Sequence, residues 1–404
     1  MLKKVQVTEL RPGMYVHELC GSWLETPFWS RSLMLDVQAK IDKIYAAGLR
    51  EAWIDTDKGL DVLPAPVAPV AAAPEPVEQG FHFAPVQPVG MDDELGRAAK
   101  LVNKSRQAVV SMFTEARMGN VVNLASAAPL VEEIANSVMR NPGALIGLAR
   151  LKEADDYTYM HSVAVCALMI ALARQLGLSD EQVREAGVAG LLHDVGKMAI
   201  PLAILNKPGR LSAQEFTEVQ GHPGAGHRML LEAGGVSQMA LEVCLHHHEK
   251  MDGSGYPDGL QGEQISQFAR MGAICDVYDA ITSNRPYKEG WCPADSLRQM
   301  AEWGRNGHFD QTMFAAFVKC LGIYPVGTLV RLKSERLGVV VEQSTKSLLM
   351  PKVRVFFSAK SKAYIAPLLL DLASPGERDQ IAAREDAKKW GLDDVDRYWL
   401  GDAY

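Results

Sequence analysis

A proline-rich stretch sets the strongest limit on how this chain can fold. Residues 63–89 read LPAPVAPVAAAPEPVEQGFHFAPVQPV, in which proline recurs every few positions. Proline removes a backbone donor and fixes φ, so it blocks helix interiors and central strands and favours an extended spacer. The chain of 404 residues also exceeds the roughly 150 to 250 residues at which a single core stops growing. We therefore expect a linker between separately folded parts.

The sequence on either side of this stretch predicts a mostly α protein. A small α+β module comes first, with one helix expected from an Asp36 N-cap to a Gly48 C-cap. An all-helical bundle follows the linker, and β-branched runs such as GVVVEQ and KVRVFF then predict a small β appendage. The expected segments are the N-terminal module (1–62), the Pro/Ala-rich linker (63–91), the helical domain (92–321), the β appendage (322–370) and a charged helical tail (371–404).

Composition excludes several classes of protein. A net charge of -7 argues against binding to a nucleic acid polymer, which requires an excess of Lys and Arg. No apolar run reaches the ~18 residues of a membrane span, and no signal peptide opens the chain. Six scattered cysteines without a CxxC pair suggest reduced thiols rather than a disulfide framework or a zinc ribbon. A cytoplasmic location is the expectation.

The sequence LLHDVGK places His193 and Asp194 together at the end of an apolar helix, with Lys197 one turn further. Imidazole and carboxylate both bind divalent metal ions, and one carboxylate can bridge two of them. A hydrogen-bonded pair at a helix end explains the dipeptide equally well. The motif alone therefore leaves a metal site and a structural pair as alternatives.

Five further residues occupy comparable positions on other expected helices: His161, His222, His247, His248 and Asp276. A buried histidine or a helix cap explains each of them singly. Together with His193 and Asp194 they form a set that facing helices of a bundle could bring to one metal site. Adjacent histidines on a helix point about 100° apart, which suits two neighbouring ions. The set therefore suggests a dinuclear centre.

At this point the order of motifs, HDVGK, KPGRLSAQEF, HHEKMDGSGYP and DVYDAITSNRPY, resembles the HD-GYP subfamily of HD-domain phosphohydrolases. The resemblance implies hydrolysis of the bacterial messenger cyclic di-GMP to pGpG or GMP. It also implies that the seven residues above are metal ligands, that Asp194 bridges two ions, and that the ions are iron or manganese.

The resemblance implies roles for further residues. A metal-bridging hydroxide would be the nucleophile, and Lys197 would stabilise the developing charge or protonate the leaving oxygen. Gly255 would let backbone approach the ligand and Tyr256 would stack on guanine. Arg285 and Lys288 would contact phosphates and the guanine edge.

One position departs from part of the family. Some members hold a third ion with a glutamate where this chain has Tyr157, so we expect two ions. Asp155 and Asp156 lie just upstream and keep a third ion open.

Two other functions remain alternatives. The chain could be a catalytically weak sensor that binds the dinucleotide, or a scaffold for a diguanylate cyclase, but no expected ligand is missing. It could also hydrolyse another nucleotide such as cyclic GMP-AMP, because an HD core does not fix the substrate.

The N-terminal module resembles an uncharacterised domain found ahead of such domains and is expected to be regulatory. A homodimer is left open.

Overall fold

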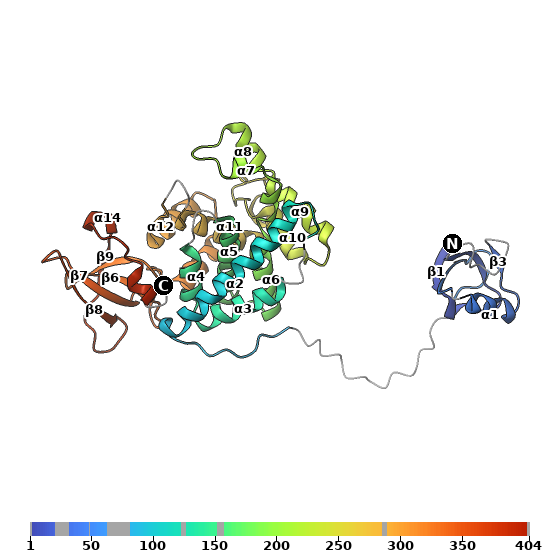
Figure 1. The fold of residues 1–404 in the computed structure, drawn as a ribbon, viewed down its shortest axis with the longest axis horizontal. Coiled ribbons are helices and arrows are strands. Elements are labelled where there is room, and N and C mark those ends of the chain that lie inside the picture. Colours follow the sequence, from blue (N-terminus) through green and yellow to red (C-terminus); the bar gives the residue numbers. More distant parts are fainter. Residues whose placement is uncertain are drawn as a thin grey trace. The chain divides into compact units, whose positions relative to one another are not determined.

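The computed structural model describes residues 2–20, 32–47, 49–62, 81–122, 127–151, 157–284 and 289–401. Contacts divide the chain into two compact units, residues 1–79 and 80–404. The finer division expected from the sequence remains a prediction, apart from its helical tail, which the structure contradicts. The mostly α fold class is confirmed, with strands confined to the N-terminal unit and the C-terminal part of the second unit in the described ranges (Figure 1).

The N-terminal unit is a four-stranded antiparallel sheet covered by one helix. Its elements are β1 (Leu2–Gln6), β2 (Tyr15–Cys20), β3 (Leu33–Met34), α1 (Gln38–Ala46) and β4 (Glu51–Asp55). The strand order is β1-β4-β2-β3. Alternate residues of β4, Ala52 and Ile54, point into a core shared with Ile41 and Ile44 of α1, so a period-two strand and an amphipathic helix bury one another.

The start of α1 differs from the expected Asp36 N-cap. The N-cap is Val37, whose side chain makes no capping bond. Asp36 instead pairs with Lys40, Oδ1 to Nζ 2.6 Å, so the carboxylate favours an ion pair over the capping position. The expected C-cap, Gly48, lies outside the described residues.

The second unit begins with helices that build the bundle. They are α2 (Met91–Arg117), α3 (Ala127–Arg140), α4 (Pro142–Arg150), α5 (Tyr157–Gln175), α6 (Asp180–Leu192), η4 (Val195–Ala199), α7 (Leu202–Leu205), α8 (Ala213–Val219), α9 (His222–Ala233), α10 (Gln238–His246), η5 (Gly262–Gln264), α11 (Gln267–Thr282), α12 (Pro293–Arg305) and α13 (Gln311–Leu321). One hydrophobic core runs through this set.

Helix α5 lies at the centre of that core. Every residue from Met160 to Ala173 is buried, so the helix is apolar on all sides and must be enclosed by others. Among the described residues it is the one helix long and apolar enough to cross a membrane, but most of it is buried inside the bundle. The histidine in its first turns is thereby held in the interior.

A buried carboxylate joins α2 to α3. Glu94 is fully buried and accepts hydrogen bonds from Ser137 Oγ (2.8 Å), from Arg140 Nε (2.7 Å) and Nη2 (2.8 Å), and from Arg97 Nε (3.0 Å). Burial raises the pKa of Glu94, but the bonds from Arg140 and Ser137 outweigh it and lower the pKa overall. A charged carboxylate in this position therefore stabilises the packing of α2 on α3.

The C-terminal strands form a five-stranded antiparallel sheet at one end of the bundle (Figure 1). They are β5 (Leu329–Leu332), β6 (Arg336–Glu342), β7 (Lys352–Ser358), β8 (Ala363–Asp371) and β9 (Ile381–Arg384), in the order β8-β7-β6-β5-β9. Leu337, Val339 and Phe356 join the core of the helices. The sheet and the bundle therefore share a hydrophobic core.

The expectation of a helical tail over 371–404 is wrong for much of that segment. Ile381–Arg384 is a strand that pairs with β5, and the helices α14 (Ala387–Trp390) and α15 (Arg397–Leu400) have four residues each. The charged side chains of this segment have the composition of a helix. The edge of β5 is nevertheless available for pairing, and β9 pairs with it, because tertiary pairing overrides intrinsic helix propensity.

We predict that Glu94→Gln lowers the free energy of unfolding of the second unit by about 3 kcal/mol at pH 7, because the arginines lose a buried counter-charge. The pKa of Glu94 is lower in the folded state than in the unfolded state. The stabilisation is therefore fully present above the unfolded-state pKa of roughly 4.3, and it is lost as the pH falls through the folded-state pKa. Urea denaturation at several pH values measures both effects. The exposed Glu232→Gln is the control, and an equal loss in both variants would contradict the assignment.

Candidate metal centre

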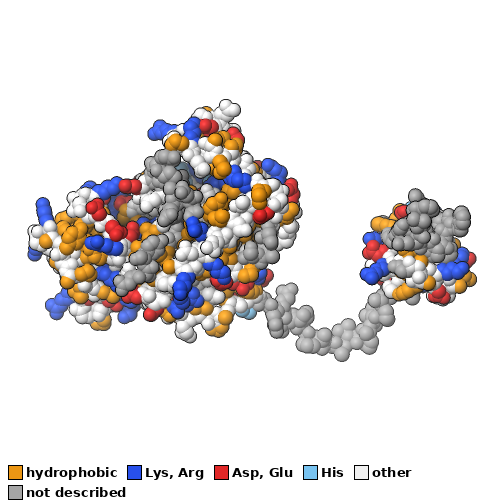
Figure 2. Space-filling model, viewed as in Figure 1, with side chains coloured by type: hydrophobic (Ala, Val, Ile, Leu, Met, Phe, Trp, Pro, Cys, Tyr) orange, Lys and Arg blue, Asp and Glu red, His pale blue; other side chains and the backbone are white. Residues whose placement is uncertain are grey.

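Seven side chains from helices far apart in the sequence converge inside the bundle. They are His161, His193, Asp194, His222, His247, His248 and Asp276, and their ligand atoms form three overlapping groups, each within 4.8 Å. Six of the seven are no more than 6% exposed, and His248 is partly exposed. On the face of the second unit drawn in Figure 2, hardly any histidine surface is visible. The structure brings the expected set together, and its role as a ligand set is a prediction.

Most of these side chains lie where a helix begins or ends. His193 follows the last residue of α6, Asp194 precedes η4, His222 opens α9 and His247 follows α10. A turn at a helix end lets neighbouring residues point in different directions. Adjacent His193 and Asp194 can therefore face the same centre.

Gly196 in HDVGK has a structural role that the sequence did not reveal. A Cβ at this position would lie 1.9 Å from the carbonyl oxygen of His222 and 2.4 Å from the backbone nitrogen of Gly226. Only glycine therefore lets α9 pack directly on the turn that follows Asp194. This close approach brings His222 to the centre.

The cluster has two halves that share both carboxylates. In the first half, Asp194 Oδ2 is 3.4 Å from His161 Nε2 and 3.4 Å from His193 Nε2. Asp276 Oδ1 is 2.9 Å from His161 Nε2 and 4.0 Å from His193 Nε2. Two imidazole nitrogens and two carboxylate oxygens thus surround one position.

In the second half, Asp194 Oδ1 is 3.2 Å from His222 Nε2 and 3.7 Å from His247 Nε2. Asp276 Oδ2 lies 3.6 Å from His248 Nδ1. Each carboxylate therefore turns one oxygen toward each half. This arrangement suits two neighbouring cations bridged by Asp194.

Backbone carbonyls fix the orientation of three of the rings. Each Nδ1 lies within hydrogen-bond distance of a carbonyl oxygen: His193 with Gly190 (2.8 Å), His222 with Val219 (2.7 Å) and His247 with Val243 (3.0 Å). A neutral imidazole that donates from Nδ1 keeps an unprotonated Nε2. The Nε2 lone pairs of these three histidines are thereby aimed at the centre. Outer-shell hydrogen-bond partners orient metal-bound histidines in the same way.

Unpartnered buried atoms show that these residues fit a metal. His193 Nε2 and Asp194 Oδ1 are buried without a hydrogen-bond partner. His222 Nε2 and His247 Nε2 lie 3.3 Å apart, and two nitrogens each ~2.1 Å from one ion lie roughly 3.0 to 3.4 Å apart. Lone pairs that face one another at this distance are repulsive unless a cation lies between them.

Burial and charge hold the ligand atoms in their metal-binding forms. Burial lowers the pKa of His193 and that of His247, and it lowers the pKa of His248 to about 3 although Asp276 opposes the shift. Burial alone would raise the pKa of Asp194, but the charge of Lys197 and the hydrogen bond with His222 hold it well below its usual range. These three imidazoles are therefore neutral and Asp194 is ionised at neutral pH, whereas burial lowers the pKa of His161 but Asp276 and Asp279 outweigh it and raise that pKa overall.

Lys197 lies beside the centre, as expected. Its Nζ is 2.5 Å from Asp194 Oδ2, and its side chain is 20% exposed. Arg117 at the end of α2 donates to the carbonyl oxygens of Lys197 (3.4 Å) and Ile200 (3.1 Å). The middle and the C-terminal end of the short helix η4 are therefore fixed, and the ammonium group is held next to the shared carboxylate.

Asp279 belongs to the site but was not singled out from the sequence. Its Oδ2 is 2.6 Å from His161 Nδ1, and its Oδ1 accepts a bond from Ser283 Oγ at 3.2 Å. Asp279 is 2% exposed. A carboxylate behind a metal-binding histidine fixes the ring and raises its basicity. The signal was the second aspartate of DVYDAI, one helical turn after Asp276.

Glu249 closes the GYP loop. Its carboxylate accepts bonds from the backbone nitrogens of Asp258 (2.7 Å), Gly259 (3.0 Å) and Leu260 (3.1 Å). A Cβ on Gly255 would lie 2.5 Å from Glu249 Cα, so the close approach at this glycine is to the chain's own backbone.

The Tyr256 ring is stacked near His248, with centroids 4.7 Å apart and a 30° angle between planes. The tyrosine thus stands over the exposed side of the centre.

Arg285 and Lys288 lie outside the described residues, as do Asp155 and Asp156. The Tyr157 ring stacks on His161 at 5.7 Å.

Two family models match the chain. A model described as an HD domain matches residues 130–313, a range that contains all seven clustered residues. A model described as a domain of unknown function matches residues 2–127, and so extends past the proline-rich stretch and α2 to the first residue of α3. The clustered residues therefore lie in the part covered by the HD model.

Curated relatives are similar to the chain over different lengths. A cyclic di-GMP phosphodiesterase of Pseudomonas aeruginosa is 56% identical over 402 residues, which cover 99% of this chain and 96% of that protein. A cyclic di-GMP phosphodiesterase response regulator of Xanthomonas campestris is 42% identical over 166 residues, 39% of this chain and 43% of that protein. A 3'3'-cGAMP-specific phosphodiesterase of Vibrio cholerae is 36% identical over 169 residues, 42% of this chain and 36% of that protein.

We predict that Asp279→Asn lowers the affinity of the apoprotein for Mn²⁺ by about 10- to 100-fold, because His161 loses the carboxylate that orients it. Asp279→Glu should recover part of that loss. Calorimetric titration of the metal-free chain measures the affinities, with the exposed Asp92→Asn as the matched control. Unchanged affinity in Asp279→Asn would refute the positioning role.

Proposed function

The chain belongs to the HD-GYP family of cyclic di-GMP phosphodiesterases, and we propose that it hydrolyses cyclic di-GMP to pGpG, GMP or both. One observation carries this proposal. Seven imidazole and carboxylate side chains lie together in groups that could hold a metal ion, within a chain that is 56% identical, along almost its whole length, to a protein of that activity.

We propose that the centre holds two divalent ions, iron or manganese. His161 and His193 would bind one ion, His222, His247 and His248 the other, and Asp194 and Asp276 would serve both. Bound divalent ions lower the pKa of water and neutralise charge on a phosphate. Mixed imidazole and carboxylate ligands agree with iron or manganese but also with other metals.

The chain's own groups would orient and protonate the substrate. Lys197 carries a positive charge next to Asp194, at a position suited to stabilise a phosphoryl oxygen or to give a proton to the leaving oxygen. Tyr256 offers a ring face to guanine above His248. We propose Arg285 and Lys288 as the contacts to phosphate, since an acidic protein needs local positive charge to hold a dianion.

A second substrate class has a specific observation in its favour. One relative of the HD part is named as specific for 3'3'-cGAMP, a ligand that keeps the two phosphodiesters and replaces one guanine by adenine. Pocket contacts to that base would decide between the two messengers.

Partners and location are also proposals. The N-terminal unit has no His/Cys/Asp/Glu metal group among its described residues, which supports a regulatory role that binds a diguanylate cyclase or a second copy of the chain. A cytoplasmic location fits a substrate that is made inside the cell. Nothing in the centre favours a sensor that binds without turnover.

Hydrolysis of cyclic di-GMP, pGpG and 3'3'-cGAMP by Mn²⁺-loaded protein, followed by liquid chromatography, tests the substrate. We predict that cyclic di-GMP is cleaved with a kcat/KM at least tenfold above that for 3'3'-cGAMP. Binding of all three without cleavage at any metal loading would overturn the proposal.

Two substitutions separate metal binding from catalysis. Asp194→Ala should abolish both bound metal and turnover, because it removes the shared ligand. Lys197→Ala should keep the metal and lower kcat by about 10²-fold or more. Metal content and steady-state kinetics are measured on the same samples, with the exposed Lys360→Ala as control. Full activity in either variant would refute the role of that residue.

A further inference from the structure

A surface cavity of about 300 Å³ lies between α2 and α3. We call it the α2–α3 pocket. Four of its lining residues are cations: Arg97, Lys100 and Lys104 follow one another at helical spacing on α2, and Arg140 ends α3. The chain as a whole carries a net charge of -7. Positive charge is therefore concentrated at this pocket against the overall balance of the protein.

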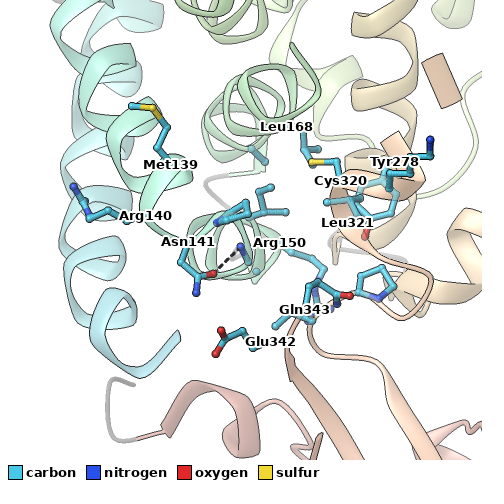
Figure 3. Close-up of a pocket in the computed structure, with 18 of the residues that line it drawn as sticks. Met139, Arg140, Asn141, Arg150, Leu168, Tyr278, Cys320, Leu321, Glu342 and Gln343 are labelled. Carbon is cyan, nitrogen blue, oxygen red and sulfur yellow. Dashed lines mark hydrogen bonds between the residues drawn. The ribbon is translucent and has the colours of Figure 1, made fainter. Parts of the chain in front are cut away.

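The two arginines are held at the pocket by the buried Glu94. Its carboxylate accepts hydrogen bonds from Arg97 Nε (3.0 Å) and from Arg140 Nε (2.7 Å) and Nη2 (2.8 Å). Figure 3, which draws a neighbouring cavity, shows the Arg140 side chain pointing away from Asn141 and the other side chains of that cavity. The bonds to Glu94 use only part of the N–H donors of each guanidinium, so both arginines keep donors for a ligand.

The two lysines differ in their partners. Lys104 pairs with Glu133 of α3, which also lines the pocket, Nζ to Oε1 2.6 Å. Lys100 lies one helical turn before Lys104, is exposed, and forms no ion pair with any residue that the structure describes. Its ammonium group is therefore available to a ligand in the pocket.

The charges around the pocket do not balance. Glu94 is ionised at neutral pH, because the bonds from Arg140 and Ser137 outweigh burial and lower its pKa. The four cations thus face two carboxylates, those of Glu94 and Glu133, and two positive charges are left over. A ligand with two negative charges would balance them.

A phosphate monoester has this charge. Its second pKa is about 6, so it is largely a dianion at neutral pH. Guanidinium groups bind phosphate oxygens through paired, charge-assisted hydrogen bonds. A phosphodiester carries one charge on each phosphate and would leave part of the positive charge unbalanced. The volume of the pocket is about twice that of an engineered ~150 Å³ cavity that binds benzene, so a phosphate and the sugar that carries it fit.

We propose that the α2–α3 pocket binds the terminal phosphate monoester of a small molecule, with Arg97, Lys100 and Arg140 as its contacts. The expected products pGpG and GMP end in such a group, whereas cyclic di-GMP contains diesters alone. The pocket would therefore bind product and not substrate. This identification of the ligand rests on the proposed function, but binding of a phosphate monoester does not.

The probe is GMP, titrated calorimetrically into the full metal-free chain. Guanosine lacks the phosphate and should bind at least about tenfold more weakly, because the charge-assisted hydrogen bonds are lost. Inorganic phosphate should displace GMP but bind about threefold or more weakly than GMP, because it makes no contact beyond the phosphate. Absence of GMP binding, equal binding of GMP and guanosine, or tighter binding of inorganic phosphate overturns the proposal.

Two variants locate the site. Lys100→Glu reverses the unpaired charge, and Asn136→Asp adds a negative charge to the wall with almost no change of shape. Each should weaken GMP binding by about tenfold or more. Lys360→Glu, the same charge reversal at an exposed position between β7 and β8, should bind GMP as the wild type does. Circular dichroism and the Tm confirm folding. Wild-type affinity in both pocket variants overturns the assignment.

A third variant separates the pocket from the metal centre. Asp194→Ala removes the shared carboxylate and should leave GMP binding to the metal-free chain unchanged. Loss of GMP binding in folded Asp194→Ala would place the nucleotide at the metal centre and overturn the proposal. Because none of these titrations requires turnover, failure of the phosphodiesterase proposal and failure of this one are distinguishable.

Discussion

The fold depends on keeping two carboxylates, Asp194 and Asp276, ionised inside a hydrophobic bundle. Both are almost fully buried, and an isolated buried carboxylate is strongly disfavoured. One lysine and five imidazoles surround them. These groups carry too little positive charge to balance the two carboxylates unless protons or metal ions are bound as well. The proposed centre would therefore be a cation-binding core as much as a catalytic one, and the bundle surrounds it.

The surroundings of this core are rigid for identifiable reasons. Helix α5 is enclosed on all sides, so His161 cannot move away from the centre without disturbing the core. Gly196 lets α9 pack directly on the turn after Asp194, and carbonyl oxygens hold three imidazoles by Nδ1. Glu249 closes the loop over the exposed side. The packing of the protein itself thus fixes the geometry of the clustered side chains, and such preorganisation favours a selective and fast site.

Much of this was readable from the sequence, and the remainder was not for physical reasons. The seven clustered residues stand out because polar ligands interrupt apolar helices, a pattern that packing alone does not favour. Asp279 was missed because a second carboxylate one turn along a helix has an ordinary solvent-facing explanation. Gly196 was missed because its reason is a contact with α9, which only the tertiary structure supplies. Strand β9 was missed because four residues carry little periodicity and their partner β5 lies far away in sequence.

The count of metal ions per chain tests the central claim most directly. Protein purified without oxygen and analysed for metals by mass spectrometry should hold two divalent ions per chain, because the shared carboxylates expose one oxygen to each half of the centre. A reproducible ratio of one ion or fewer in fully folded protein, even after incubation with excess iron or manganese, would contradict the account.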